Sequence, residues 1–287
     1  MKKILSFIIV VTVFGMVGCE KEYSVEDGGN SNDPNIIGAD CRISKIVFTD
    51  SSSGTAKGSI AAIINSSDKV TDVTKFDSLT ATIDYNSVPV FMGDSLYINP
   101  DEFYILDAVT KRVKSFQGLI DPSNPFSPKF NASYSYDAAG NLVGKIYAAP
   151  LINFGIPYLA VGYTYTAGNI TGMSEIDLTT GDLNSDAVIS YYPSMAPKNF
   201  WYLFPDEDTY APYSQFLNFG NRPTNAVQQL KLRYYNPGNS VRDSAISNFR
   251  SYTKSIDNYI TSVVMTGSNQ ACIPALTGKL KFSYKCK

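Results

Sequence analysis

The chain has 287 residues, 44% of them hydrophobic and 17% charged, and its formal net charge is −2. A weak acidic balance with scattered lysines provides no basic stripe, which argues against nucleic acid as a ligand. The sequence contains no histidine, which excludes Ser-His-Asp and Cys-His nucleophile pairs and histidine-ligated metal sites.

The N-terminus has the profile of a secretory signal: two lysines and then an apolar run to Val17, too short for a comfortable membrane span. The run stops at MVGC, which resembles the lipobox of bacterial lipoproteins, in which the cysteine is lipidated and becomes the new N-terminus. We therefore expect residues 1–18 to be a signal peptide and Cys19 to carry a lipid such as palmitate. An ordinary signal peptide with a chance cysteine is the alternative.

Residues 19–40 are predicted to be a flexible tether, because their Glu, Asp, Asn, Gly and Ser content cannot bury enough apolar surface to offset the entropy of ordering. The acidic start, CEKE, resembles the surface-export signals of some Gram-negative lipoproteins. We expect an outer-membrane lipoprotein of a Gram-negative bacterium, and both the periplasmic and the cell-surface face remain open.

Residues 41–287 are expected to form a single β-rich domain, since no long linker divides them. In an oxidising compartment, Cys41, Cys272 and Cys286 give one disulfide and one spare thiol. A Cys41–Cys286 bond would close nearly the whole domain and stabilise it by roughly 5 kcal/mol in the chain-entropy treatment. This favours it over a Cys272–Cys286 bond, which would close only a short loop. No Cys-x-x-Cys spacing indicates zinc.

Period-2 alternation of aromatic or aliphatic residues dominates the sequence, as in FNASYSY, YLAVGYTY, LKLRYY and LKFSYKC. Twenty tyrosines and sixteen phenylalanines stand against one tryptophan, a bias that suits pleated, half-buried surfaces. The pattern predicts an all-β fold.

Several segments share a frame of Tyr-x-Tyr, a turn with Gly-Asn, and Leu or Ile to start the return strand, as in residues 134–142 and 163–170. Tyr136 and Tyr165 are 29 residues apart, about one hairpin plus its return, so the repeat is architectural. In the turn DAAGN, Asp137 can accept hydrogen bonds from backbone amides, which predicts a capping role without catalytic duty.

The segment YSYDAAGNLVGKIY resembles the Tyr-Asp (YD) repeat of RHS-type proteins. The chain as a whole is similar to a family of β-rich bacterial lipoproteins of unknown function, whose domain opens with a Cys-Arg-hydrophobic strand, here CRISKIVF, and ends in an aromatic strand with a cysteine, here FSYKCK. The resemblance implies a long antiparallel meander of YD-like hairpins, twisted or curled toward a barrel, and supplies no catalytic residue.

Residues 191–224 break the repeat and form one irregular, aromatic-rich insertion. Aromatic rings beside carboxylates suit sugars, whose apolar faces stack while their hydroxyls find acceptors. The alternative is that these aromatics plug one end of the sheet as a small core. The candidate ligand platform consists of Trp201, Tyr202, Phe204, Asp206, Asp208, Tyr210 and Tyr213.

Asp182, Asn184 and Asp186 have the spacing that opens an EF-hand calcium loop. The match then fails, because Ala187 stands where glycine is needed and Pro193 where a bidentate acid is needed. An Asx-rich turn between strands is the better interpretation, and we expect no metal or other cofactor.

These features predict a lipid-anchored cell-envelope protein with a non-catalytic binding or structural role that includes glycan contact. Its expected partners are the membrane, through the lipid, and a glycan or envelope protein. One alternative is a carboxylate-dependent glycan hydrolase that uses Asp206 or Asp208 with a second acid. Another is a scaffold for a partner protein.

Overall fold

The computed structural model describes residues 41–50, 55–66, 69–77, 82–121, 124, 126–150, 154–198, 213, 215–269 and 277–286. Its regular elements in these ranges are β-strands of one seventeen-stranded sheet, which confirms the all-β prediction. No helix in these ranges is long and apolar enough to cross a membrane. The strands are β1 (Cys41–Thr49), β2 (Ala56–Ile64), β3 (Val70–Asp77), β4 (Thr82–Ser87), β5 (Val90–Met92), β6 (Ser95–Asn99), β7 (Glu102–Leu106), β8 (Val113–Leu119), β9 (Lys129–Tyr136), β10 (Leu142–Ala148), β11 (Pro157–Thr166), β12 (Asn169–Asp177), β13 (Leu183–Tyr191), β14 (Val227–Tyr235), β15 (Val241–Lys254), β16 (Ile260–Asn269) and β17 (Gly278–Cys286).

The sequence alternation becomes an alternation of burial along strands such as β15. In β15, Asp243, Ala245, Ser247 and Phe249 are buried, and the residues between them are half-buried. Successive side chains of a strand point to opposite faces, so one face of the sheet collects the buried side chains. That face is concave and holds a single hydrophobic core, to which strands from β1 to β17 contribute.

The sheet is a meander in which strands adjacent in sequence pair antiparallel from β5 through β17. β17 then pairs with β1, and the order continues to β4. An even number of antiparallel steps separates β5 from β4 around the sheet, so both strands run in the same direction. They are one extended segment bent at residues 88–89.

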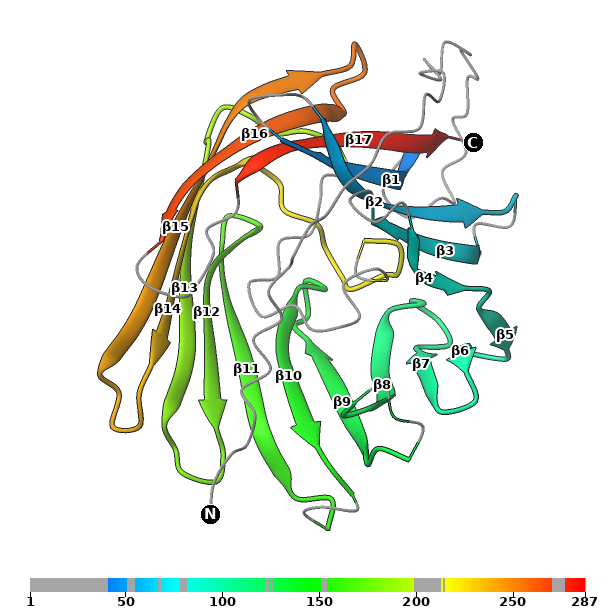
Figure 1. Ribbon diagram of the computed structural model, residues 1–287, viewed down its shortest axis with the longest axis vertical. Helices are drawn as coiled ribbons and strands as arrows, with labels where there is room; N and C mark the ends of the chain where they lie inside the picture. Colours follow the sequence, from blue (N-terminus) through cyan, green and yellow to red (C-terminus); the bar gives the residue numbers. More distant parts are fainter. Residues whose placement is uncertain are drawn as a thin grey trace.

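The strand pairing changes at this bend. Before it, β4 pairs with β3, and after it, β5 pairs with β6. Pro89 lies at the bend and has no N–H to donate, which suits an interrupted ladder. The sheet therefore curls without closing into a barrel, as the curled meander predicted from the sequence requires (Figure 1).

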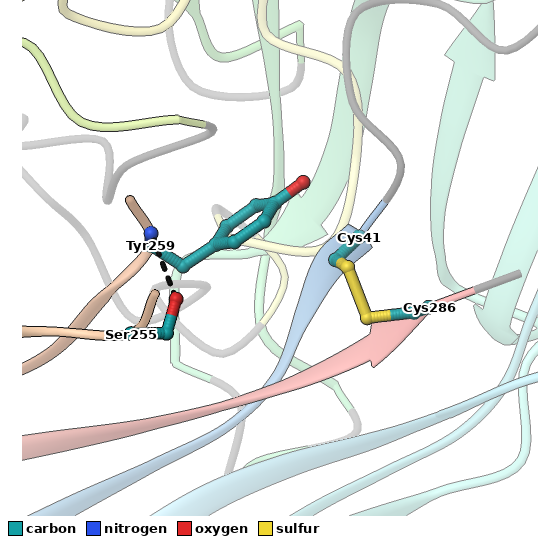
Figure 2. The surroundings of a disulfide bond; sticks show 4 residues. All are labelled: Cys41, Ser255, Tyr259 and Cys286. Carbon is teal, nitrogen blue, oxygen red and sulfur yellow. Dashed lines mark hydrogen bonds between the residues drawn. A yellow bond between two sulfur atoms is a disulfide. The ribbon is translucent and has the colours of Figure 1, made fainter. Parts of the chain in front are cut away.

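A disulfide joins the first and the last strand of the chain. Cys41 and Cys286 are direct partners in the β1–β17 ladder, and their sulfur atoms are bonded across a sequence separation of 245 residues. Figure 2 shows this bond near Tyr259 of the β15–β16 turn, whose backbone N–H donates to Ser255 Oγ at 3.1 Å. The predicted pairing is confirmed, and the Cys272–Cys286 alternative is wrong.

Turn aspartates act as the sequence predicts. The Asp137 carboxylate accepts hydrogen bonds from the side-chain amide and the backbone N–H of Asn141, both at 2.8 Å, and these bonds hold its pKa below the ordinary value. In the β7–β8 turn, the backbone N–H of Thr110 lowers the pKa of Asp107 in the same way. Both carboxylates are occupied in shaping hairpins.

Replacing Cys41 and Cys286 together by alanine should lower the free energy of unfolding by up to about 5 kcal/mol, because the unfolded chain regains the entropy of a very long loop. Denaturant unfolding measures the loss. Reducing agent should bring the native protein to the stability of the double variant, and the matched control Cys272→Ala should leave stability unchanged. Native stability that does not respond to reduction would contradict the prediction.

Candidate functional site

The turns of the meander alternate between two ends of the sheet. The plug end, as we name it, carries the turns 107–112, 137–141, 167–168 and 255–259 and the long β13–β14 connection, residues 192–226. The opposite tip end carries the turns 120–128, 149–156, 178–182 and 236–240, which follow the lower edge of the molecule in Figure 1. The aromatic-rich insertion predicted from the sequence coincides with the β13–β14 connection.

The described part of this connection binds one hairpin turn after another, at a spacing of three residues. The backbone carbonyl of Asn218 accepts from the N–H of Val113 at the start of β8, at 2.9 Å. The N–H of Asn221 donates to the Gly140 carbonyl in the β9–β10 turn, at 3.0 Å. Thr224 Oγ1 donates to a carbonyl in the β11–β12 turn, at 2.9 Å. The connection therefore fastens three neighbouring hairpins together.

A glycine allows the closest of these approaches. Gly220 has a φ of +89°, and a Cβ added there would lie 2.4 Å from the carbonyl oxygen of Gly140. That distance is far inside van der Waals contact, and an L side chain is strained at this φ. The connection can reach the β9–β10 turn only because this position has no side chain.

Both flanks of residues 199–212 are attached to the sheet at the plug end. On one side, the N–H of Lys198 donates to the carbonyl of Asn258, and the Asn258 side chain donates to the carbonyl of Ala196, at 3.0 and 2.7 Å. On the other side, Tyr213 Oη donates to Ser87 Oγ at 2.8 Å. The residues on both sides of segment 199–212, which contains most of the predicted platform residues, are therefore hydrogen-bonded to the plug end.

The apolar side chains after this segment fill the concave side of the sheet. Tyr213 and Phe216 are completely buried, and Leu217 and Phe219 nearly so. The ring of Tyr104 in β7 lies 5.7 Å from that of Tyr213 and 6.2 Å from that of Phe219, measured between centroids. This part of the insertion is a core plug.

The structure therefore corrects one predicted site residue: Tyr213 is not a platform residue, because full burial leaves no ring face for a ligand. It brings Cys41 and Cys286 together as predicted. The following predicted residues lie outside the described ranges and stay predictions: Cys19, Trp201, Tyr202, Phe204, Asp206, Asp208 and Tyr210.

Arg42 links the first strand to the plug. Arg42 directly follows the disulfide-bonded Cys41 in β1, and its guanidinium donates to the backbone carbonyl of Phe216. A charge-assisted hydrogen bond is worth more than a neutral one, particularly in a partly buried place. The Cys-Arg start of the domain thus places a covalent bond and a strong hydrogen bond side by side.

Tyrosine hydroxyls form a repeated contact that sequence reasoning missed. In four hairpins, a tyrosine near the plug end of the second strand donates to a backbone carbonyl at the start of the first strand. Burial raises the pKa of Tyr191, Tyr252 and Tyr284, which keeps these three donors protonated. The four bonds are Tyr136 to Val113 at 2.7 Å, Tyr191 to Ile170 at 2.8 Å, Tyr252 to Val227 at 2.6 Å and Tyr284 to Ile260 at 2.6 Å.

The acids of the calcium-like spacing have structural partners. Asn184 and Asp186 lie within β13 and not in a loop. The Asp186 carboxylate pairs with the guanidinium of Arg233 and accepts from Tyr235 Oη at 3.0 Å. Within the described ranges, no group of three or more Cys, Asp or Glu side chains could hold a metal ion.

Changing Tyr252 to phenylalanine should lower the free energy of unfolding by about 1–3 kcal/mol, because the Val227 carbonyl loses this buried donor. Urea unfolding measures the change. The matched control is Tyr97→Phe, a half-exposed tyrosine whose hydroxyl makes no hydrogen bond within the described ranges, and its effect should stay within about 0.5 kcal/mol. Equal losses of stability in both variants would rule out a special role for the four tyrosines that donate to backbone carbonyls at the plug end.

Comparison with solved structures shows a shared fold. A porin-like protein from Bacteroides uniformis aligns with a TM-score of 0.57 at 11% identity, covering 85% of this chain and 98% of that chain. A porin-like protein from Bacteroides vulgatus gives 0.49 at 10% identity, with the same coverage of 85% and 98%. The Photorhabdus luminescens Tc holotoxin pore gives 0.25 at 8% identity over 76% of this chain and 12% of that chain. No protein-family model matches the sequence, and no curated protein matches it. The chain is thus similar in fold to the Bacteroides uniformis porin-like protein.

Proposed function

We propose that this chain is a lipid-anchored protein of a Gram-negative envelope that works by binding, without catalysis, and contacts glycans at the plug end. The observation that carries the proposal is the plug: the concave side is packed with the chain's own side chains, and the insertion is fastened to the surrounding turns. A rigid β scaffold with a long insertion held at both flanks is a common way to present a binding surface.

The envelope location rests on the N-terminal sequence. The apolar run ending at Cys19 and the polar residues 20–40 precede the first strand, which begins at Cys41. A disulfide between Cys41 and Cys286 fits a compartment outside the cytoplasm, where such bonds persist. The fold shared with a porin-like Bacteroides protein is compatible with this location.

Mass spectrometry of the protein from membranes of its expression host should find an acyl group on Cys19 at the processed terminus. Cys19→Ser should remove the acyl group and release the protein from the membrane fraction, since the predicted span is too short to hold it. Cys272→Ala is the matched control and should stay in the membrane fraction. An unmodified N-terminus on a chain that still sediments with membranes would overturn the anchor.

The glycan contact rests on residues 199–212, which combine the single tryptophan with three consecutive acids. Their flanks, Lys198 and Tyr213, are held at the plug end. Stacking on a tryptophan ring and hydrogen bonding to carboxylates are the two contacts that sugars need.

Trp201→Ala should weaken retention of a bound polysaccharide about tenfold, the equivalent of about 1.4 kcal/mol, because one stacking ring is lost. Affinity electrophoresis in gels containing polysaccharide measures retention, and circular dichroism confirms that the variant folds. The matched control is Phe154→Ala, an exposed aromatic residue at the tip end, which should bind like the native protein. The appearance of new reducing ends in the polysaccharide would contradict the binding proposal and favour the glycan hydrolase alternative.

A further inference from the structure

The tip end of the sheet exposes apolar side chains on four consecutive hairpin connections. Phe126 and Phe154 are 92% and 95% exposed, and the others are about half exposed. Four of the five lie in the β8–β9, β10–β11 and β12–β13 connections, and Val241 is the first residue of β15, directly after the β14–β15 turn. The five side chains are Phe126, Phe154, Ile156, Leu178 and Val241.

This grouping is unusual for hairpin connections. A single exposed apolar side chain is ordinary, but several that share one edge mark an interaction surface. The four connections follow one edge of the molecule in Figure 1, and the backbone N–H of Leu178 donates to the carbonyl of Tyr158, so two of them lie side by side. The apolar side chains therefore project from a common rim.

The way these side chains project favours a fluid partner. The five side chains are spread over four hairpins, so a rigid protein partner would have to match all four at once. The boundary of a bilayer accepts separate apolar side chains without matched pockets.

The charge of the tip end selects the kind of lipid. Its acids include Asp177 at the end of β12, Asp121 in the β8–β9 connection and Asp182 in the β12–β13 connection. Two of its lysines are neutralised in ion pairs: Lys57 Nζ lies 2.9 Å from the carboxylate of Asp50, and Lys129 Nζ lies 2.8 Å from that of Asp101. Arg242, next to Val241, adds one exposed cation. The remaining excess of acids disfavours anionic headgroups, and this leaves a zwitterionic lipid surface as the partner.

We infer that the tip end docks onto a zwitterionic lipid surface, with Phe126 and Phe154 inserted at the headgroup boundary. The inference rests on the proposed function in one respect, that a lipid on Cys19 brings the domain to a membrane. Residues 20–40 can extend about 70 Å. β15, the longest strand, spans about 46 Å, so a tether joined at the plug end lets the tip end reach the bilayer.

A tryptophan placed at each end tests this in the acylated protein reconstituted in phosphatidylcholine vesicles. In a Trp201→Phe background, Phe154→Trp reports on the tip end. Ile256→Trp, at a fully exposed position in the β15–β16 turn of the plug end, is the matched control. Lipids brominated in their acyl chains should quench about half of the emission of the Phe154→Trp chain, because docked side chains lie about 5–10 Å into the boundary. The Ile256→Trp chain should keep its emission.

Equal quenching of both chains, or stronger quenching of the Ile256→Trp chain, would overturn the inference. Quenching that rises with the share of phosphatidylglycerol would also overturn it. So would a blue shift in the tryptophan emission of the Phe154→Trp chain that depends on protein concentration and not on lipid, because this would indicate self-association. Adding Phe126→Asp to the Phe154→Trp chain should lower its quenching at least twofold. The anchor is judged separately by the mass of the N-terminus, and a chain without an acyl group that is still quenched on added vesicles would support docking without anchoring.

Discussion

The pairing of β17 with β1 is the contact on which the rest of the structure depends. A meander of hairpins needs no long-range contact until its last strand, and without this ladder both terminal strands would be open edges. Eight residue pairs and the Cys41–Cys286 bond bring the two ends of the chain together. The curl that results creates a concave side, and only a concave side gives the β13–β14 connection a place to pack. Arg42, beside the disulfide, ties that connection to the closure itself.

The plug end is held by backbone polar groups more than by charge. Tyrosine hydroxyls occupy carbonyls at the starts of four strands, and the connection around Asn218, Asn221 and Thr224 occupies groups in three turns. Turns of a sheet end normally leave such groups to water. Here they are paired within the protein, so each hairpin is fixed to its neighbours at two levels, through the ladder and across the rim. The insertion thereby stiffens the end at which residues 199–212 begin and finish.

Sequence reasoning succeeded where the chemistry is local and failed where it depends on register. Alternation, the Asp137 turn and the likelihood of a disulfide between Cys41 and Cys286 follow from neighbours in sequence or from loop length. The carbonyl that the Tyr252 hydroxyl reaches depends on how β15 lines up with β14, which no local pattern specifies. Tyr213 was misjudged for the same reason: an aromatic residue in a polar, irregular segment has no alternation to show its burial, and only the curl of the sheet puts it inside.

Within the described residues, the exposed phenylalanine rings lie at the tip end, whereas the plug end exposes aliphatic side chains such as Val109 and Ile256. At the plug end, large apolar side chains such as Phe216 turn inward and are buried by the sheet. At the tip end, Phe154 and Ile156 stay exposed on their connection. Exposed aromatic rings favour aggregation unless something covers them. The proposed docking onto a lipid surface would cover the rings of Phe126 and Phe154 at the end opposite the plug.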